Sequence, residues 1–313
     1  MRIFSAEETR QALPYPETVE ALREAFRQDI EVPVRHHHTM ARQQEPDATL
    51  LLMPAWEGEA YVGVKLLTVT PGNAERGLPA ILGVYLLNDG RTGAPLALID
   101  GPMLTVRRTA AASALAADYL ASRQSEHLLM VGTGALSAHL IEAHASVRPI
   151  RRVSVWGRNP EKAEAVARSL NLPNITTSGV TDLEAAVAEA DIISCATLSP
   201  EPLVHGEWLR PGQHLDLVGA FTPEMRESDD EAVRRASLFV DTRDGCLKEG
   251  GDIVQPLQQG VIQERDIRAD LFDLTAGRHA GRASEEEITL FKSVGTAVED
   301  FAAAKLVVEQ AGL

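Results

Sequence analysis

HLLMVGTGALSAHLIEAHAS, residues 127–146, is the stretch that decides the fold of this 313-residue chain. Its first apolar run predicts a buried strand, and apolar residues at helical spacing later in the stretch predict a helix. Between them, Gly132 permits a tight turn and Gly134 lets a pyrophosphate approach the backbone. Ser137 replaces the usual third glycine, where the helix packs on the strand. We interpret the stretch as a dinucleotide-binding turn; a purely structural glycine turn is the alternative.

A second strand is predicted at residues 152–158, and its end is where such folds meet the adenosine ribose. That end carries Gly157-Arg158-Asn159, without the Asp or Glu that would accept a hydrogen bond from the ribose of NAD. A guanidinium suits a 2′-phosphate, which a carboxylate would repel. We therefore expect NADP(H) as the preferred cofactor and NAD(H) as the second choice. A solvated surface charge is the alternative for Arg158.

Strand and helix patterns alternate beyond this point, as in a doubly wound parallel sheet. Helices are predicted at residues 161–170 and 182–189, and strands at 175–180, 191–197, 214–221 and 238–241. Ligands bind outside the carboxyl ends of such strands. We therefore expect Ala196-Thr197 and residues 218–221 to line a nicotinamide pocket.

The first hundred residues predict a separate, antiparallel or mixed sheet. A capping box at Ser5 opens one helix, a second follows at residues 16–28, and strand patterns punctuated by glycines run from 49 to 100. Lys65 interrupts the most apolar of these strands. Since an unpaired buried ammonium is costly, Lys65 either snorkels to solvent or faces a ligand.

Two arginines, Arg107 and Arg108, are expected at the start of an alanine-rich helix that ends near Ser122. Cations oppose the dipole at a helix N-terminus, so a bound anion would explain them. The pattern makes either arginine a candidate clamp for a substrate carboxylate. An ion pair with one of the many acidic residues is an equally favoured alternative.

Composition excludes several classes of function. The net charge of −15 disfavours nucleic acid or an anionic membrane as a partner, and no apolar run is long enough to span a bilayer. Cys195 and Cys246 are interpreted as reduced thiols of a cytoplasmic protein. Three consecutive histidines, at 36–38, would alternate faces in an extended segment, so we expect no metal there.

Five stretches together are specific enough to indicate a family: VKLLTVTPGN around Lys65, LTVRRTAAASALAA around Arg108, VGTGALSAHL, HLDLVGAFTPEMRE and GRASEEEITLFKSVGTAVEDFAAAKL. With them the chain resembles the ornithine cyclodeaminase/mu-crystallin family over nearly its whole length. The resemblance implies a homodimer. Its substrate-binding and dimerisation domain, of α+β class, would span residues 1–115 and be completed by 291–313. A Rossmann domain would occupy residues 116–290.

The resemblance also implies residue roles. Lys65 and Arg108 would be the catalytic residues and, with Arg35, would hold the carboxylate of a small amino or imino acid. The implied cofactor contacts are Thr109, Gly132, Thr133, Gly134, Ala135, Leu136, Gly157, Arg158, Asn159, Ala196, Thr197, Val218, Gly219, Ala220, Ser293 and Gly295.

The chain departs from the family at two positions that distinguish its cyclodeaminases from its other members. Its cyclodeaminases use an acidic residue after the Val-Gly pair, where this chain has Phe221, and a second carboxylate before a Met-Pro pair, where it has Leu50-Leu51-Leu52. Neither side chain can accept a proton or hold an ammonium group. We therefore expect a cationic pocket with no acidic helper.

That expectation favours an NAD(P)H-dependent reductase of pyrroline-2-carboxylate or piperideine-2-carboxylate. The alternatives are an ornithine cyclodeaminase, an alanine dehydrogenase of the family, and a non-catalytic NADPH-binding protein like mu-crystallin. Lys65 and Arg108 are both retained, which argues against an inactive site.

Overall fold

The computed structural model describes residues 1–313 except for the side chain of Ala74. The chain forms two compact units: Met1–Thr109 with Ala297–Leu313, and Ala110–Thr296. The sequence predicts the divisions at 115 and 291 instead. They differ because helix α3 (Gly101–Leu120) passes from the first unit into the second, and because Thr289–Lys292 forms a strand of the second unit.

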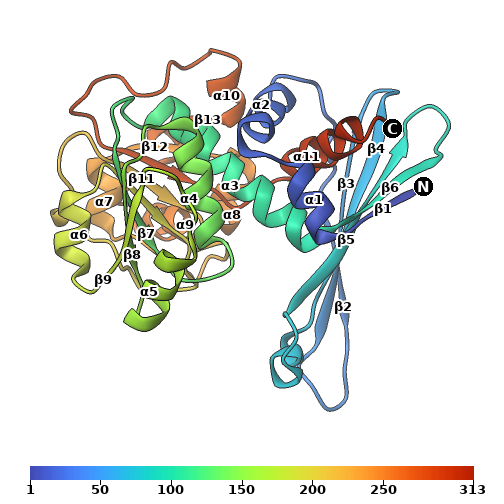
Figure 1. The fold of residues 1–313 in the computed structure, drawn as a ribbon, viewed down its shortest axis with the longest axis horizontal. Coiled ribbons are helices and arrows are strands. Elements are labelled where there is room, and N and C mark those ends of the chain that lie inside the picture. The colour runs from blue at the N-terminus through green and yellow to red at the C-terminus, as the bar shows by residue number, and fades with distance from the viewer. The chain divides into compact units, whose positions relative to one another are not determined.

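The first unit is a mixed sheet with helices on one face. Strand order is β1-β6-β5-β4-β3-β2, with β1 parallel to β6 and the other neighbours antiparallel. Helix α11 lies against β3, β4, β5 and α2, and its ribbon is dark red in Figure 1. The elements are β1 (Arg2–Phe4), α1 (Ala6–Ala12), α2 (Tyr15–Ala25), β2 (His36–Met40), β3 (Ala48–Glu57), β4 (Tyr61–Val69), the 3₁₀ helix η1 (Pro71–Arg76), β5 (Ile81–Asp89), β6 (Pro95–Asp100) and α11 (Ala297–Gln310).

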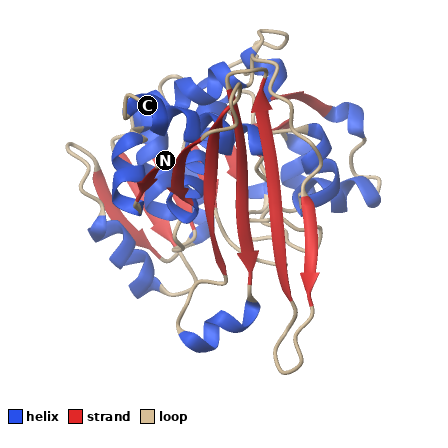
Figure 2. Cartoon of the chain, turned by 90° about the vertical axis from the view of Figure 1, so that its right-hand side faces the viewer, coloured by secondary structure: helices blue, strands red, loops and turns tan.

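The two faces of this sheet differ in burial. Side chains alternate across a strand, so Met53, Tyr85 and Ile99 lie on the covered face and are buried with Phe301 of α11. The opposite face is also apolar, yet Val62, Leu66 and Leu82 are exposed there by 36–41%. Figure 2 shows that no helix of this unit covers it. The first unit thus has one buried core face and one open apolar face.

The second unit is a parallel sheet of order β13-β12-β14-β11-β10-β7-β8-β9. This arrangement confirms the predicted class, a doubly wound α/β domain together with an α+β domain. The elements are β7 (His127–Val131), α4 (Ser137–Val147), β8 (Arg152–Trp156), α5 (Pro160–Ser169), β9 (Thr176–Val180), α6 (Leu183–Glu189), β10 (Ile192–Cys195), η2 (Gly206–Trp208), β11 (His214–Leu217), α7 (Asp230–Arg235), β12 (Ser237–Val240), α8 (Arg243–Glu249), α9 (Gly251–Gln258), η3 (Glu264–Asp266), β13 (Ile267–Asp270), α10 (Leu271–Thr275) and β14 (Thr289–Lys292).

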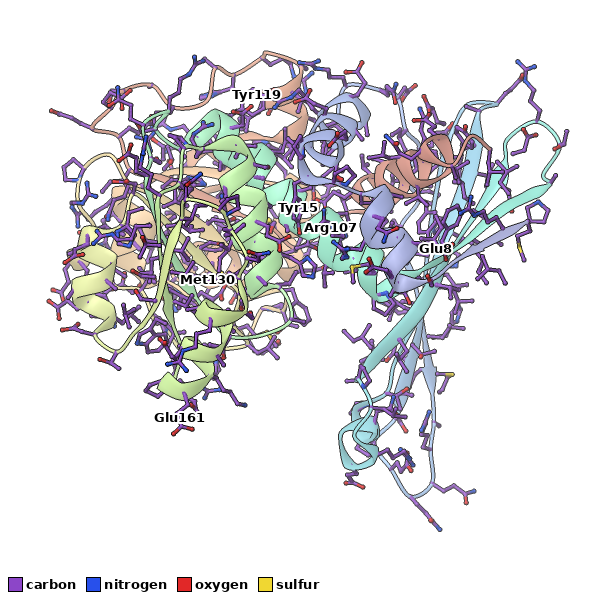
Figure 3. The ribbon with its side chains drawn as sticks, viewed as in Figure 1. Glu8, Tyr15, Arg107, Tyr119, Met130 and Glu161 are labelled. Atoms are coloured by element: carbon purple, nitrogen blue, oxygen red, sulfur yellow. The ribbon has the colours of Figure 1, made fainter. Side chains whose placement is uncertain are left out.

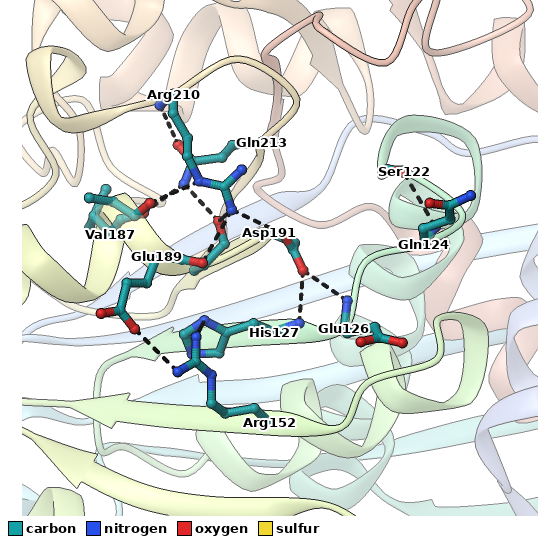
Figure 4. Close-up of polar contacts among 12 residues, drawn as sticks. Ser122, Gln124, Glu126, His127, Arg152, Val187, Glu189, Asp191, Arg210 and Gln213 are labelled. Carbon is teal, nitrogen blue, oxygen red and sulfur yellow. Dashed lines mark hydrogen bonds and ion pairs between the residues drawn. The ribbon is translucent and has the colours of Figure 1, made fainter.

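Polar contacts join the amino ends of β7 and β10 (Figure 4). One carboxylate oxygen of Asp191 accepts hydrogen bonds from the backbone N–H groups of Glu126 and His127, at 2.9 and 3.0 Å. Its other oxygen accepts from Arg210 at 3.0 Å. The glycine turn follows the carboxyl end of β7, at the opposite edge of the sheet.

The structure shows where the two cysteines and the three consecutive histidines lie. Cys195 and Cys246 are buried free thiols. The histidines form edge strand β2, where His36 pairs with Leu52 and His37 with Leu51, so successive rings do alternate faces. Among the described residues, no three His, Cys, Asp or Glu side chains group as metal ligands. None of the helices described has both the length and the apolar character needed to cross a bilayer.

Candidate functional site

The glycine turn of the second unit has the geometry that dinucleotide binding needs. Gly132 has a φ of 129°, and a Cβ there would lie 2.6 Å from the carbonyl oxygen of Ala196, so only glycine fits. The Ser137 hydroxyl donates to the Gly132 carbonyl at 2.9 Å. A Cβ at Gly134 would meet nothing within 4 Å, and α4 begins without a side-chain cap. The turn therefore offers open space and uncapped N–H groups to a phosphate.

The end of β8 lies beside this turn, because a Cβ at Gly157 would come 2.6 Å from the Thr133 side chain. Arg158 is exposed and makes no hydrogen bond or ion pair with the described residues. The Asn159 side chain accepts from the Lys162 N–H at 3.1 Å and so caps α5. Among the predicted ribose-binding residues, Arg158 therefore carries a charge that is free to bind a ligand.

The carboxyl ends of β10, β11 and β14 meet at one edge, since these strands are neighbours. This register gathers five predicted cofactor residues there: Ala196, Thr197, Val218, Gly219 and Ala220. Ser293 also joins the edge, because its N–H donates to the Leu217 carbonyl at 3.1 Å.

Two further residues that are predicted to contact the cofactor lie on other segments. The Gly295 N–H donates to Asp241 at 2.6 Å, and the φ of Gly295 is 83°. Thr109 lies in α3 as the last residue of the first unit. All of the cofactor contacts stay predictions.

The first unit contains a buried cluster of four charged side chains. Lys65 of β4 and Arg108 of α3 are 3% and 7% exposed. The Lys65 Nζ and the Arg108 Nε each donate to Oδ1 of Asp300, both at 2.9 Å. The Arg108 Nη1 donates to Glu299, and both acids belong to α11 and have no exposed surface. The predicted substrate residues are therefore brought together by two carboxylates.

Their pKa shifts follow from burial and from one another. Burial lowers the pKa of Lys65, and the attraction of Asp300 does not fully offset it. Burial alone would raise the pKa of Asp300, but Arg108 and Lys65 hold it below its usual range. Burial would likewise lower the pKa of Arg108, whereas Asp300 and Glu299 raise it overall. Asp300 is thus an ionised anchor and a poor base.

Some hydrogen-bonding capacity of the cations remains unused. The Arg108 Nη2 makes no hydrogen bond with the described residues. The Lys65 ammonium has three N–H donors and gives one of them to Asp300. Both groups can therefore still donate to a ligand carboxylate.

The expected place of the two arginines at the start of a helix was wrong. Helix α3 begins at Gly101, so Arg107 and Arg108 lie in its second turn, beyond the first N–H groups. The dipole argument for a bound anion therefore fails, and Arg108 adopts the alternative, an ion pair. Arg107 lies elsewhere: its Nε donates to the Leu13 carbonyl at 2.9 Å, and its guanidinium stacks on Tyr15 at 3.6 Å (Figure 3).

The expectation of no acidic helper was also wrong. Glu299 and Asp300 touch the two cations, and their signal in the sequence was an acidic pair inside the alanine-rich helix AVEDFAAAK. Phe221, at the position of the family's missing acid, is 43% exposed. Arg35 lies half-buried just before β2, and its role in substrate binding stays a prediction.

Comparison with known proteins gives a consistent result. The model of the ornithine cyclodeaminase/mu-crystallin family matches residues 2–312. A Delta(1)-pyrroline-2-carboxylate reductase of Colwellia psychrerythraea is 38% identical over 99% of both chains. The solved structure of Thermococcus litoralis Delta(1)-pyrroline-2-carboxylate reductase in complex with NADH and L-proline is 36% identical, with a TM-score of 0.92 over 99% of this chain and 97% of that one. An archaeal alanine dehydrogenase dimer with bound NAD is 32% identical, with a TM-score of 0.89 over 99% and 96%.

Proposed function

We propose that this chain, which belongs to the ornithine cyclodeaminase/mu-crystallin family, is an NAD(P)H-dependent reductase of a small cyclic imino acid. Its substrate would be Δ1-pyrroline-2-carboxylate or Δ1-piperideine-2-carboxylate, and its product L-proline or L-pipecolate. The observation that carries this proposal is the buried cluster of Lys65 and Arg108, in which both cations are anchored on Asp300 and retain unused donors. The names of the similar reductases support it.

The charge balance of the cluster suits a zwitterion. Two cations and two carboxylates cancel, so a substrate that carries one carboxylate and one iminium group adds no net charge. The substrate carboxylate would accept from the Arg108 Nη2 and the Lys65 Nζ, which fixes the ring.

The hydride step then needs little from the protein. When bound, the reduced nicotinamide supplies the hydride. A new C–H bond forms at the imine carbon, and the π electron pair of the C=N bond moves to the nitrogen. Because the substrate binds as the iminium cation, no proton is needed at that moment.

The cofactor would bind on the second unit. The open backbone at Gly134 and the uncapped start of α4 fit a pyrophosphate. A preference for NADP(H) is supported by the exposed, unpaired Arg158. The similar solved structures hold NADH or NAD, so NAD(H) is the competing cofactor.

A cyclodeaminase would need a base and an anchor for a second amine. Phe221 supplies neither, and Asp300 is already held by two cations. The test is cofactor oxidation, followed by absorbance, with each imino acid. We expect turnover with at least one of them and none with ornithine and NAD⁺. Proline and ammonia from ornithine, without imine reduction, would refute the proposal, and reductive amination of pyruvate would favour the alanine dehydrogenase.

We also propose that the protein is a homodimer joined through the open face of the first sheet. That face presents Val62, Leu66 and Leu82 to solvent, and exposed apolar patches of this kind usually mark an interface. A similar solved structure is a dimer.

The proposed location is the cytoplasm, supported by the two free thiols.

A further inference from the structure

Glu227 joins the two segments that follow β10 and β11. Its side chain is fully buried. Oε1 accepts from the N–H and the hydroxyl of Thr197, at 2.6 and 2.8 Å. Oε2 accepts from the N–H groups of Gly219 and Ala220, at 2.7 and 3.3 Å. One carboxylate therefore holds the backbone of both segments.

The two segments are packed so closely that their geometry has little freedom. A Cβ at Gly219 would lie 1.9 Å from the Thr197 carbonyl oxygen and 2.6 Å from Glu227 Oε1. Only glycine fits at that point. Any shift of the Glu227 carboxylate would move Thr197 and Gly219 together.

Other buried charges hold Glu227 itself. Asp252, in the first turn of α9, accepts from the N–H groups of Glu227 and Ser228, both at 2.9 Å. Lys292, the last residue of β14, lies 3.5 Å from the other oxygen of Asp252 and donates to the Leu217 carbonyl at 3.2 Å. The three charged side chains have no exposed surface. They connect β10, β11, β14 and α9 at the carboxyl edge of the sheet.

Burying these three charged side chains costs free energy that an apolar cluster would not. Two carboxylates share one ammonium away from water, so one of them lacks a counter-charge when both are ionised. Burial, with the nearby Asp252, raises the pKa of Glu227 to about 7 although Lys292 opposes the shift. An apolar side chain would avoid that cost, but it could not accept four hydrogen bonds from two separate segments.

We propose that Glu227 is a positioning residue for the nicotinamide end of the cofactor, because it fixes the backbone of Thr197, Gly219 and Ala220. The inference rests on the proposed function, since these residues are predicted to line the nicotinamide pocket. In this role Glu227 touches neither cofactor nor substrate. It also does not replace the acid missing at Phe221, because all of its contacts are to backbone or to the Thr197 hydroxyl.

The test compares two ligands that differ only in the nicotinamide end. NADH has it, and ADP-ribose lacks it but keeps the adenosine and the pyrophosphate. In Glu227→Gln the amide NH₂ must face backbone donors, so at least one buried donor loses its acceptor. We expect the Kd for NADH to rise about tenfold. The Kd for ADP-ribose should stay unchanged, and kcat should fall.

The controls separate positioning from folding. Glu201→Gln makes the same change at an exposed position in the segment after β10 and should alter neither Kd. If Glu227→Gln does not fold, Thr197→Val removes one hydrogen bond to Glu227 and should give the same split at smaller size. Equal weakening of both ligands, or no weakening of either, would overturn the inference. A wild-type protein that binds neither NADH nor NADPH would instead refute the proposed function.

Discussion

Replacing Arg158 by serine should change the choice of cofactor and little else. The side chain is exposed and has no partner among the described residues, so its loss should alter the free energy of unfolding by no more than about 0.5 kcal/mol. A hydrogen bond to a charged group contributes roughly 1.5–3 kcal/mol. Solvent exposure places Arg158 at the low end of that range. About 1.5 kcal/mol corresponds to roughly a tenfold loss in kcat/KM for NADPH.

The assay is steady-state kinetics with NADPH and NADH at one concentration of imino acid. Arg158→Ser should lower kcat/KM for NADPH about tenfold and leave the value for NADH within about twofold. The difference should shrink at high salt. Arg152→Ser is the matched control, because Arg152 begins the same strand and pairs with Glu189 at the surface, at 3.2 Å. Equal losses with both cofactors, or no loss with NADPH, would refute the assignment of Arg158 to the 2′-phosphate.

Three further predictions concern the buried charges and the open sheet face. Asp300→Asn leaves two buried cations short of a partner, so the free energy of unfolding in urea should fall by about 3–5 kcal/mol; an unchanged midpoint would contradict the ion-pair account. Burial lowers the pKa of His214 from 6.5 to about 3, so the unfolded chain binds the extra proton as pH falls below 6.5. The His214 contribution to stability should therefore drop by about 2 kcal/mol between about pH 7 and pH 5, whereas the raised pKa of Glu227 acts in the opposite direction. In urea titrations His214→Asn should therefore gain about 2 kcal/mol relative to the wild type between about pH 7 and pH 5, and an equal pH slope in both proteins would exclude the His214 contribution. Leu66→Lys places a charge on the open face and should shift dimer to monomer in sedimentation equilibrium, whereas an intact dimer would show that the interface lies elsewhere.

Local patterns predicted the second unit well. The strand, turn and helix around Gly132 are confirmed, because turn chemistry and apolar spacing act within a few residues. The central strand β14 was missed. Its sequence ITLFKS follows the polar run SEEE and is not among the predicted strands, yet Thr289–Lys292 pairs with both β11 and β12. Long-range pairing decided its conformation.

The start of α3 was missed although a signal was present. The Asp100 carboxylate accepts from the Met103 N–H at 2.8 Å, and Pro102 follows Asp100 closely, as is common in a first helical turn. The apolar strand before Asp100 obscured this boundary.

The partners of Lys65 and Arg108 could not be predicted from spacing. The Lys65 contact with Asp300 joins positions 235 residues apart, and the Arg108 contact with the same carboxylate spans 192. A buried lysine indicated that some partner existed. Only the packing of α11 against β4 identified it.

Isotope transfer from cofactor to product distinguishes reduction of the imino acid from deamination of ornithine. NADH or NADPH that carries two deuterium atoms at C4 is incubated with the enzyme and Δ1-pyrroline-2-carboxylate, and the product is examined by chiral chromatography and mass spectrometry. We expect L-proline with one deuterium at C2. Proline without deuterium, or proline formed only from ornithine with release of ammonia, would contradict it.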